Sequence, residues 1–240
     1  MENICSIIDS TFLKENNNSE FLNNFIQEAI DYRFRLVMIR PEYISLAKDL
    51  IIKNKSDLEI GTVIDFPDGR APLEDKLFQL KKAIDLGSDE LDVVINYSAF
   101  IDGKFELVTQ EVVSCSKFVL LKGKKIKWII ESAALTKDEI KQICVLIRDA
   151  VLHNFSTNLY EKVFTKSSTG FYKTKNSKAN GATLESVKIM IKNSYPLPVK
   201  ASGGIRNLSD INEFVKLGVK RIGTSSASKI INGLSNNINY

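Results

Sequence analysis

Two lysines stand at places in the sequence where a short apolar run gives way to serine and glycine. One is Lys166, in the segment VFTKSSTGF at residues 163–171, and the other is Lys200, in the segment PVKASGG at residues 198–204. Lysine is among the residues that folded proteins bury least often. Two apolar runs that each end on a lysine therefore indicate a chemical use for the amine.

The chemistry that such a pair could perform is attack on a carbonyl carbon. A lysine ammonium is a poor nucleophile at its usual pKa of about 10.4, and lowering that pKa to about 7 would raise the neutral fraction roughly a thousandfold at neutral pH. Burial and a second cation nearby both lower the pKa. One of the two lysines would form a Schiff base and the other would keep it uncharged, while Asp92 could move a proton or orient a water. The alternative is that each lysine reaches solvent from a strand end or pairs with a carboxylate.

A phosphate-binding region is indicated by two clusters of glycine and serine near the C-terminus. The first covers residues 202–206 (SGGIR) and the second covers residues 223–226 (GTSS). Glycine lets the backbone approach an anion, amide and hydroxyl groups donate hydrogen bonds to it, and Arg206 would add positive charge. The alternative is that both clusters are ordinary tight turns.

The elements that must position these groups are eight short runs rich in isoleucine and valine. Near-continuous apolar character over this length is typical of parallel strands that are covered on both faces. The runs lie near residues 5–9, 35–39, 59–66, 90–96, 126–132, 161–167, 197–202 and 220–225. Segments with helical spacing separate them, at residues 19–34, 43–52, 72–86, 105–121, 136–152, 182–193 and 207–218. We expect Thr136 and Thr183 to cap two of these helices, and Gly87 and Gly218 to end two others.

Eight strands that alternate with helices predict an α/β fold, the (β/α)8 TIM barrel. The series runs without a linker, so we expect a single domain over residues 1–240, with a flexible tail from about residue 233. The alternative is a doubly wound open sheet, which more often has about five to seven strands. In the barrel, functional groups gather at the C-terminal ends of the strands and in the loops that follow. The polar residues in or at the ends of the predicted strands are Asp9, Thr11, Asp92, Glu131, Lys166 and Lys200.

The composition argues against several other classes of protein. A net charge of +4 over 240 residues is too weak for a nucleic-acid-binding surface, although it suits a small anionic substrate. The three cysteines form no CxxC pair, so we expect neither a disulfide framework nor a thiolate metal site. The N-terminus does not resemble a signal peptide, and no run approaches the roughly 20 apolar residues of a membrane span. We therefore expect a cytoplasmic protein.

Four motifs, spread along most of the chain, together resemble the deoxyribose-phosphate aldolase family. KSSTGF at residues 166–171 is similar to the family's Schiff-base lysine motif, usually KTSTGF, and VKASGGIR at residues 199–206 is similar to its second lysine motif. LDVVIN at residues 91–96 resembles the family's aspartate strand, and RIGTSS at residues 221–226 resembles its phosphate turn. Any one of these motifs alone would be weak, but the four together are specific.

The resemblance implies a class I aldolase without metal or cofactor, which interconverts 2-deoxy-D-ribose 5-phosphate with D-glyceraldehyde 3-phosphate and acetaldehyde. It implies degradation of deoxynucleosides as the physiological context, and it makes a homodimer plausible. Lys166 would carry the Schiff base, Lys200 would lower its pKa, and Asp92 would assist proton transfer. The residues expected to contact substrate or its phosphate are Asp9, Thr11, Gly170, Gly203, Gly204, Arg206, Gly223, Ser225 and Ser226.

Several residues depart from the family's usual pattern. Ser10 stands where a histidine is common, and Gly61 replaces a common cysteine. Asp65 replaces a glycine near the end of the third predicted strand, and Asp68 replaces a leucine in the turn that follows. The loop at residues 172–180 is longer and richer in lysine than is usual in the family. These departures bear on substrate affinity and loop closure more than on the chemistry.

Three other residues carry expectations of their own. Tyr240 ends a polar tail of a kind that is usually disordered, but some family members also end in tyrosine, so Tyr240 could fold back to relay a proton. His153 is expected at the surface. Glu131 is expected to act as a structural hydrogen-bond acceptor inside the barrel, although the sequence alone does not decide this.

Two other classes of function stay open from the sequence. A phosphate-binding barrel that acts as an isomerase or epimerase would need an acid–base pair without an imine. A non-catalytic phosphosugar-binding barrel would need no activated amine, so the presence of Lys166, Lys200 and Asp92 together speaks against it.

Overall fold

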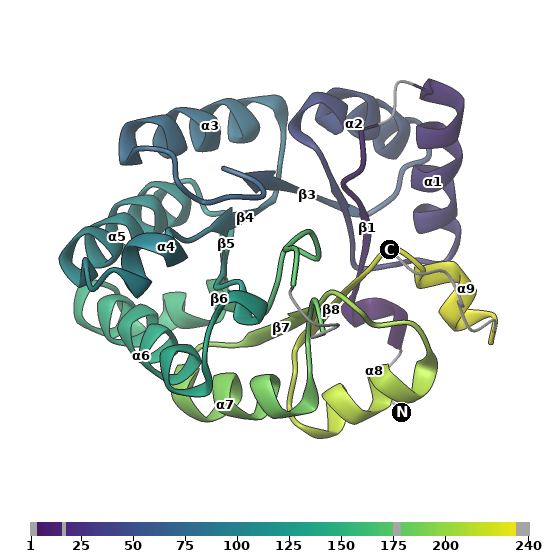
Figure 1. Ribbon diagram of the computed structural model, residues 1–240. Coiled ribbons are helices and arrows are strands. Elements are labelled where there is room, and N and C mark those ends of the chain that lie inside the picture. The colour runs from purple at the N-terminus through teal and green to yellow at the C-terminus, as the bar shows by residue number, and fades with distance from the viewer. Residues whose placement is uncertain (1–3, 16–17, 175–178, 234–240) are drawn as a thin grey trace.

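A closed barrel of eight parallel strands forms the centre of the computed structural model, which describes residues 4–15, 18–174 and 179–233 (Figure 1). The strands follow one another in chain order, and the last pairs with the first. This closure confirms the predicted (β/α)8 barrel and excludes the open sheet. The strands are β1 (Ile8–Phe12), β2 (Leu36–Ile39), β3 (Glu59–Ile64), β4 (Glu90–Val94), β5 (Lys125–Ile129), β6 (Val163–Lys166), β7 (Val199–Ser202) and β8 (Arg221–Thr224).

Helices surround the barrel on its outside, as Figure 1 shows. The α-helices are α1 (Ser19–Asp31), α2 (Ile44–Lys53), α3 (Leu73–Leu86), α4 (Tyr97–Ile101), α5 (Phe105–Leu121), α6 (Lys137–Asn154), α7 (Leu184–Ser194), α8 (Leu208–Lys216) and α9 (Ala227–Ile231). Short 3-10 helices are η1 (Ile4–Ile7), η2 (Pro41–Tyr43), η3 (Ser132–Ala134) and η4 (Thr157–Lys162). The sequence does not predict α4 and α9, because five residues are too few to show a helical period.

Local signals determine where several helices begin and end. Thr136 and Glu139 form a capping box at the start of α6, in which each side chain accepts a hydrogen bond from the other residue's backbone N–H. Thr183 caps α7 in the same way with Ser186. Gly87 ends α3 in the left-handed conformation with φ 115°, which glycine adopts without strain. These boundaries agree with the predictions from sequence.

The interior of the barrel divides into an apolar part and a charged part. Four buried side chains near β1, β2 and β3 form a small apolar cluster: Leu13, Leu36, Met38 and Val63. Strands β4 to β8 contribute buried charged residues: Glu90, Asp92, Lys127, Lys166, Lys200 and Arg221. Because side chains alternate along a strand, the apolar residues between these charges point outward and join the larger core beneath the helices.

Candidate active site

Lys166, Lys200 and Asp92 meet inside the barrel. Strands β6 and β7 pair so that the two lysines are direct neighbours in register. Each ammonium donates a hydrogen bond to the same carboxylate oxygen, Asp92 Oδ2 on β4, at 2.9 Å from Lys166 Nζ and 2.8 Å from Lys200 Nζ. All three residues are buried. The structure thus brings together the three residues that the sequence singles out, while their chemical roles stay predictions.

A third lysine, Lys127 on β5, completes the surroundings of Asp92. Lys127 Nζ lies 2.6 Å from Asp92 Oδ1 and 2.7 Å from Glu90 Oε2. One oxygen of Asp92 is therefore occupied by Lys127, and the other is left to the two lysines of β6 and β7. The sequence analysis missed Lys127, although a lysine between the isoleucine and tryptophan of an otherwise apolar strand is itself a signal of an inward-facing charge.

Asp9, Glu90 and Arg221 form a further layer of buried charge. Asp9 Oδ2 lies 2.5 Å from Lys200 Nζ, and Asp9 Oδ1 accepts a hydrogen bond from Arg221 Nε at 2.8 Å. Arg221 Nη1 also donates to Glu90 Oε1 at 3.0 Å. Asp9 is fully buried, so its carboxylate belongs to this network, whereas the sequence analysis expects it to contact substrate. Glu90 and Arg221 were not predicted, because their partners come from distant parts of the chain.

The balance of charge explains why one lysine of this network loses its proton more easily than the others. Among the buried side chains of this network, Asp9, Glu90 and Asp92 carry three negative charges, and Lys127, Lys166, Lys200 and Arg221 carry four positive ones when all are protonated. The partly exposed Lys125 also pairs with Glu90, at 2.9 Å. Burial, reinforced by the cation of Lys200, lowers the pKa of Lys166 to about 8, although Asp92 opposes the shift. Burial alone would raise the pKa of Asp92, but Lys127, Lys166 and Lys200 hold it far below its usual range. Loss of one proton from Lys166 balances the charges of the buried members of the network.

The loops after β6 and β7 approach each other through glycine. Gly170, Gly203 and Gly204 all adopt positive φ, at 79°, 83° and 75°. Gly181, which the sequence analysis missed, has no room for a side chain, since a Cβ there would lie 2.4 Å from the backbone of Gly203. The backbone N–H of Ala182 donates to the carbonyl of Gly203 at 3.1 Å. The backbones of the two loops thus pack together and form one continuous surface at the C-terminal end of the barrel.

The turn after β8 lies beside the turn after β7. Thr224 Oγ1 donates a hydrogen bond to the carbonyl of Ile205 at 3.0 Å, which joins the two turns. Gly223 makes room for a catalytic candidate, because a Cβ at this position would lie 3.0 Å from Lys200 Cε. Ser225 is exposed, while Ser226 is buried. The predicted phosphate-binding residues of these turns are therefore gathered on one side of the lysines.

Comparison with known proteins agrees with this geometry. Residues 5–236 match the family described as DeoC/LacD family aldolase. The chain belongs to the DeoC/LacD aldolase family. A deoxyribose-phosphate aldolase from Thermococcus kodakarensis is 38% identical over 231 residues, which cover 96% of each chain, and one from Staphylococcus epidermidis is 36% identical over 240 residues, or 99% of this chain and 100% of that one. The structure of deoxyribose phosphate aldolase from Aeropyrum pernix, titled a unique tetrameric structure, has a TM-score of 0.78, 32% identity and coverage of 95% of this chain and 89% of that chain.

In this DeoC/LacD aldolase, Glu131 holds the loop that carries the lysine motif. Its buried carboxylate accepts hydrogen bonds from Ser168 Oγ at 2.8 Å and from the backbone N–H of Thr169 at 3.2 Å, as well as from the Thr169 hydroxyl. Glu131 itself adopts φ 51°, which is uncommon for a residue with a side chain. The expectation that Glu131 is a structural acceptor is confirmed.

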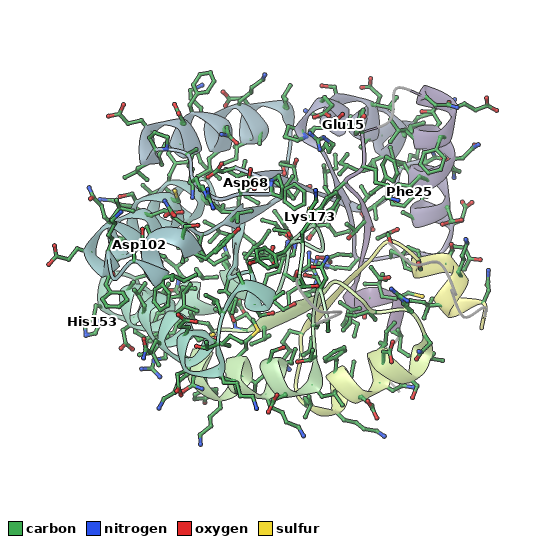
Figure 2. All side chains as sticks on the ribbon, viewed as in Figure 1. Glu15, Phe25, Asp68, Asp102, His153 and Lys173 are labelled. Atoms are coloured by element: carbon green, nitrogen blue, oxygen red, sulfur yellow. The ribbon has the colours of Figure 1, made fainter. Side chains whose placement is uncertain are left out.

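Aromatic pairs tie the same loop to the opposite side of the barrel end. Phe66, after β3, contacts Phe171 edge to face at 5.0 Å between ring centroids, and Tyr97 of α4 contacts Tyr172 at 6.4 Å. Figure 2 shows Lys173, from the loop after β6, drawn over the centre of the barrel.

The remaining expectations concern residues away from the lysines. His153 lies exposed in the last turn of α6, at the outer edge of the molecule in Figure 2, which confirms its surface position. Tyr240 and residues 175–178 of the long loop lie outside the described residues. Among the residues that the structure describes, no group of three or more His, Cys, Asp or Glu side chains is arranged to hold a metal ion.

Proposed function

We propose that this protein is a deoxyribose-phosphate aldolase, which reversibly cleaves 2-deoxy-D-ribose 5-phosphate to D-glyceraldehyde 3-phosphate and acetaldehyde through a lysine Schiff base. The observation that carries the proposal is the buried lysine pair on one oxygen of Asp92, with the pKa of Lys166 lowered to about 8. The names of the relatives from Thermococcus and Staphylococcus support the choice of substrate.

The mechanism begins with the neutral amine of Lys166. Its lone pair attacks the aldehyde carbon of the open-chain sugar to give a carbinolamine. The carbinol oxygen takes up one proton from the nitrogen and one from water and leaves as water, so the imine keeps the remaining N–H proton and is positively charged. The hydroxyl on the third carbon then gives its proton to water, the bond between the second and third carbons breaks, and the electron pair moves to the imine nitrogen to form an enamine. D-Glyceraldehyde 3-phosphate leaves. Protonation of the second carbon and hydrolysis of the imine release acetaldehyde and restore Lys166.

Lys200 and Asp92 control the protonation and the orientation of Lys166 in this scheme. Asp92 stays ionised and orients the ammonium groups, because the pKa of its carboxyl is held far below the usual range. Lys200 donates a hydrogen bond to Asp92 at 2.8 Å and forms an ion pair with Asp9 at 2.5 Å. It supplies the positive charge that favours an uncharged Lys166. With Asp9 and Arg221 behind it, Lys200 is held in place, since each of its contacts is itself fixed by a second charge.

The phosphate is assigned to the turns after β6, β7 and β8. Backbone amides at positive-φ glycines point into a common concavity in many anion sites, and Arg206 and the two serines would add charge and hydroxyl donors. The residues proposed to contact the phosphosugar are Thr11, Gly170, Gly203, Gly204, Arg206, Gly223, Ser225 and Ser226. Asp9 is proposed to act on substrate through Lys200.

The test of the imine is borohydride reduction in the presence of acetaldehyde, followed by peptide mass spectrometry. We expect an ethyl group on the peptide that contains Lys166, and none in Lys166→Leu. Lys166→Leu should also abolish turnover while it still binds phosphosugar, and the exposed Lys188→Leu on α7 should behave as wild type. An adduct at Lys200 would reverse the roles of the two lysines. No adduct at saturating aldehyde would return the protein to the isomerase or binding-barrel alternatives.

Three further expectations belong to this proposal. Among the described residues, no helix combines the length and apolar character needed to cross a membrane. A cytoplasmic location is proposed, as the sequence predicts. Tyr240 is proposed to relay a proton to the enamine. If its deletion left the exchange of acetaldehyde methyl protons unchanged, the relay would be excluded.

Self-association as a homodimer is proposed as well, and the tetramer named for the Aeropyrum relative supports assembly of this fold.

A further inference from the structure

The buried charge network reaches solvent at the N-terminal end of the barrel, opposite the turns proposed to bind phosphate. Lys125, the first residue of β5, lies there with its Nζ 2.9 Å from Glu90 Oε1 and 3.4 Å from Glu59 Oε2. Glu59, at the start of β3, also pairs with Arg35. The side chains of Lys125 and Glu59 are 27% and 26% exposed, whereas the side chain of Glu90 is fully buried. A partly exposed cation thus contacts a buried carboxylate.

A chain of ion pairs leads from this end of the barrel to Lys166. Glu90 Oε2 lies 2.7 Å from Lys127 Nζ, which lies 2.6 Å from Asp92 Oδ1. Asp92 Oδ2 accepts the hydrogen bond of Lys166 at 2.9 Å. The sign of the charge alternates along this chain, and all four of these side chains are buried. Because salt screens buried charges much less than exposed ones, a change of charge at one end of the chain acts on the other end.

The length of this chain is short enough for a measurable effect. Ile129 on β5 is the register partner of Lys166, and Lys125 comes four residues before Ile129. At about 3.3 Å per residue, the two levels of the barrel are about 13 Å apart along the strand. At that separation and an effective dielectric constant of about 20, one unit charge shifts the titration midpoint of another by about 0.9 pH unit. Solvent screening of the partly exposed Lys125 reduces this shift to about 0.5 pH unit.

We propose that Lys125 and Glu59 are positioning residues that set the protonation of Lys166 from the end of the barrel opposite the proposed substrate site. The positive charge of Lys125 favours loss of the proton from Lys166, and the negative charge of Glu59 opposes it. The meaning of this control for catalysis rests on the proposed function, in which the neutral amine of Lys166 forms the Schiff base. The electrostatic coupling itself can be measured without turnover.

The groups around Lys166 keep their own contacts when Lys125 is changed. Among the described residues, the ion pairs of Lys125 are with Glu59 and Glu90, and Glu90 keeps its pairs with Lys127 and Arg221. The charged side chains that face Lys166, or that stand behind its neighbours, are Asp92 and Glu90 on β4, Lys127 on β5, Glu131 after β5, Lys200 on β7, Asp9 on β1 and Arg221 on β8.

The test is the titration of Lys166, followed by NMR of protein isotope-labelled at the lysine Cε atoms. The signal of Lys166 is assigned by its loss in Lys166→Leu. We expect the midpoint to rise by about 0.5 pH unit in Lys125→Met and to fall by about the same amount in Glu59→Gln. The double variant Lys125→Met/Glu59→Gln should return close to the wild-type midpoint. Lys125→Arg keeps the positive charge and should also titrate as wild type.

Lys124→Met is the matched control. Lys124 carries the same charge one residue earlier, but it pairs with Asp89 at 2.8 Å and is not part of the chain of ion pairs. Its loss should move the midpoint by less than about 0.1 pH unit. Borohydride trapping of acetaldehyde at Lys166 should follow the NMR midpoints, while KM for the phosphosugar above these midpoints stays unchanged. Circular dichroism of each variant reports the fold.

Two results would overturn the inference. One is an unchanged midpoint in folded Lys125→Met and Glu59→Gln, and the other is a shift in Lys124→Met as large as in Lys125→Met. If Lys125→Met failed to fold, the nearly isosteric Glu59→Gln would decide alone. Failure of the proposed function gives a different result, in which the NMR midpoints shift as expected but no ethyl group is trapped at Lys166.

Discussion

Lys166 and Lys127 show how the number of carboxylate contacts decides the charge of a buried lysine. Both ammonium groups lie beside Asp92, and burial on its own lowers the pKa of each. Lys127 contacts Asp92 and Glu90 at 2.6 and 2.7 Å, so the pKa of Lys127 is raised in spite of burial. Lys166 contacts Asp92 only at an oxygen that it shares with Lys200. The lysine with the weaker electrostatic compensation is the one that can become a nucleophile.

The pH dependence of turnover should follow Lys166. Its pKa of about 8 means that the reactive neutral amine is scarce below pH 8 and dominant above it. We expect kcat/KM to fall about tenfold for each pH unit below 8, since activity tracks the neutral fraction. The measurement is kcat/KM for 2-deoxy-D-ribose 5-phosphate over roughly pH 5.5 to 9, the range in which a group with this pKa titrates. A profile that is flat below pH 8 would contradict the assignment.

Removal of the second lysine should move this profile to higher pH. In Lys200→Met, the Asp92 oxygen that the two lysines share contacts Lys166 alone, and the neighbouring cation is gone. The pKa of Lys166 therefore rises, and its amine becomes neutral only at a higher pH. We expect the rate of borohydride trapping at Lys166 to need a higher pH than in wild type. Lys188→Met on α7 is the matched control and should leave the profile in place. A profile unchanged in Lys200→Met would remove Lys200 from this role.

At the scale of the elements, Lys76 joins three parts of the barrel. Its ammonium donates to the carbonyls of Gly69, in the loop after β3, at 3.1 Å and of Val94, at the end of β4, at 2.8 Å. It also pairs with Glu111 of α5 and, at 3.3 Å, with Asp65. The loop that presents Phe66 to the barrel end is therefore tied to α3, β4 and α5 through one side chain.

Lys76→Met should destabilise the protein by about 3–5 kcal/mol, because it leaves Glu111 buried without its cation. The free energy of unfolding in urea measures the effect. Lys76→Met with Glu111→Leu should recover most of the loss, since both buried charges are then gone. Lys141→Met, at an exposed position of α6, should change stability by less than about 0.5 kcal/mol. A single Lys76→Met variant as stable as wild type would show that this buried cluster adds nothing to the fold.

Glu131 positions the loop after β6 and should affect catalysis through it. Glu131→Ala removes the acceptor of Ser168 and Thr169, the residues that follow the lysine strand. We expect kcat/KM to drop about a hundredfold, since small displacements of a catalytic group are costly. Trapping with acetaldehyde should still label Lys166, because its contact to Asp92 does not involve the loop. Equal loss of trapping and turnover would point to general disruption of the site instead.

At the scale of the whole molecule, the charged part and the apolar part of the barrel interior lie beside different strands. The charged part draws its residues from β1 and β4 to β8, and the apolar cluster fills the space near β2 and β3. Gly61 on β3 belongs to this filling, because a Cβ there would lie 2.5 Å from Met38 Cε and 2.8 Å from Leu36 Cδ2. Gly61 stands where the family usually has cysteine, and the space that its missing side chain leaves is filled by Met38.

Gly61→Ala should destabilise the protein by about 1–3 kcal/mol, the usual cost of extra volume in a packed interior. Replacement of Met38 by Val in the same chain should restore much of the loss, and a double-mutant cycle in urea measures the coupling. Gly103→Ala is the control for replacing a glycine without a packing clash, since a Cβ there meets nothing within 4 Å. Any loss of stability in Gly103→Ala comes from its backbone φ of 76° alone. Additive effects of Gly61→Ala and Met38→Val would contradict direct packing between the two positions.

What the sequence determined by itself is local in origin. Apolar runs, helical spacing, the Thr136 and Thr183 caps and the glycine after α3 all depend on neighbouring residues, so the barrel and most of its boundaries could be predicted. The tertiary structure alone decided the contacts of the charges. Lys127 and Arg221 are recognisable only once strand register places them beside Asp92 and Asp9, because alternation along a strand says which way a side chain points but not which partner it meets. For the same reason only the closed barrel shows which buried cations and carboxylates meet, including the Asp92 oxygen that Lys166 shares with Lys200.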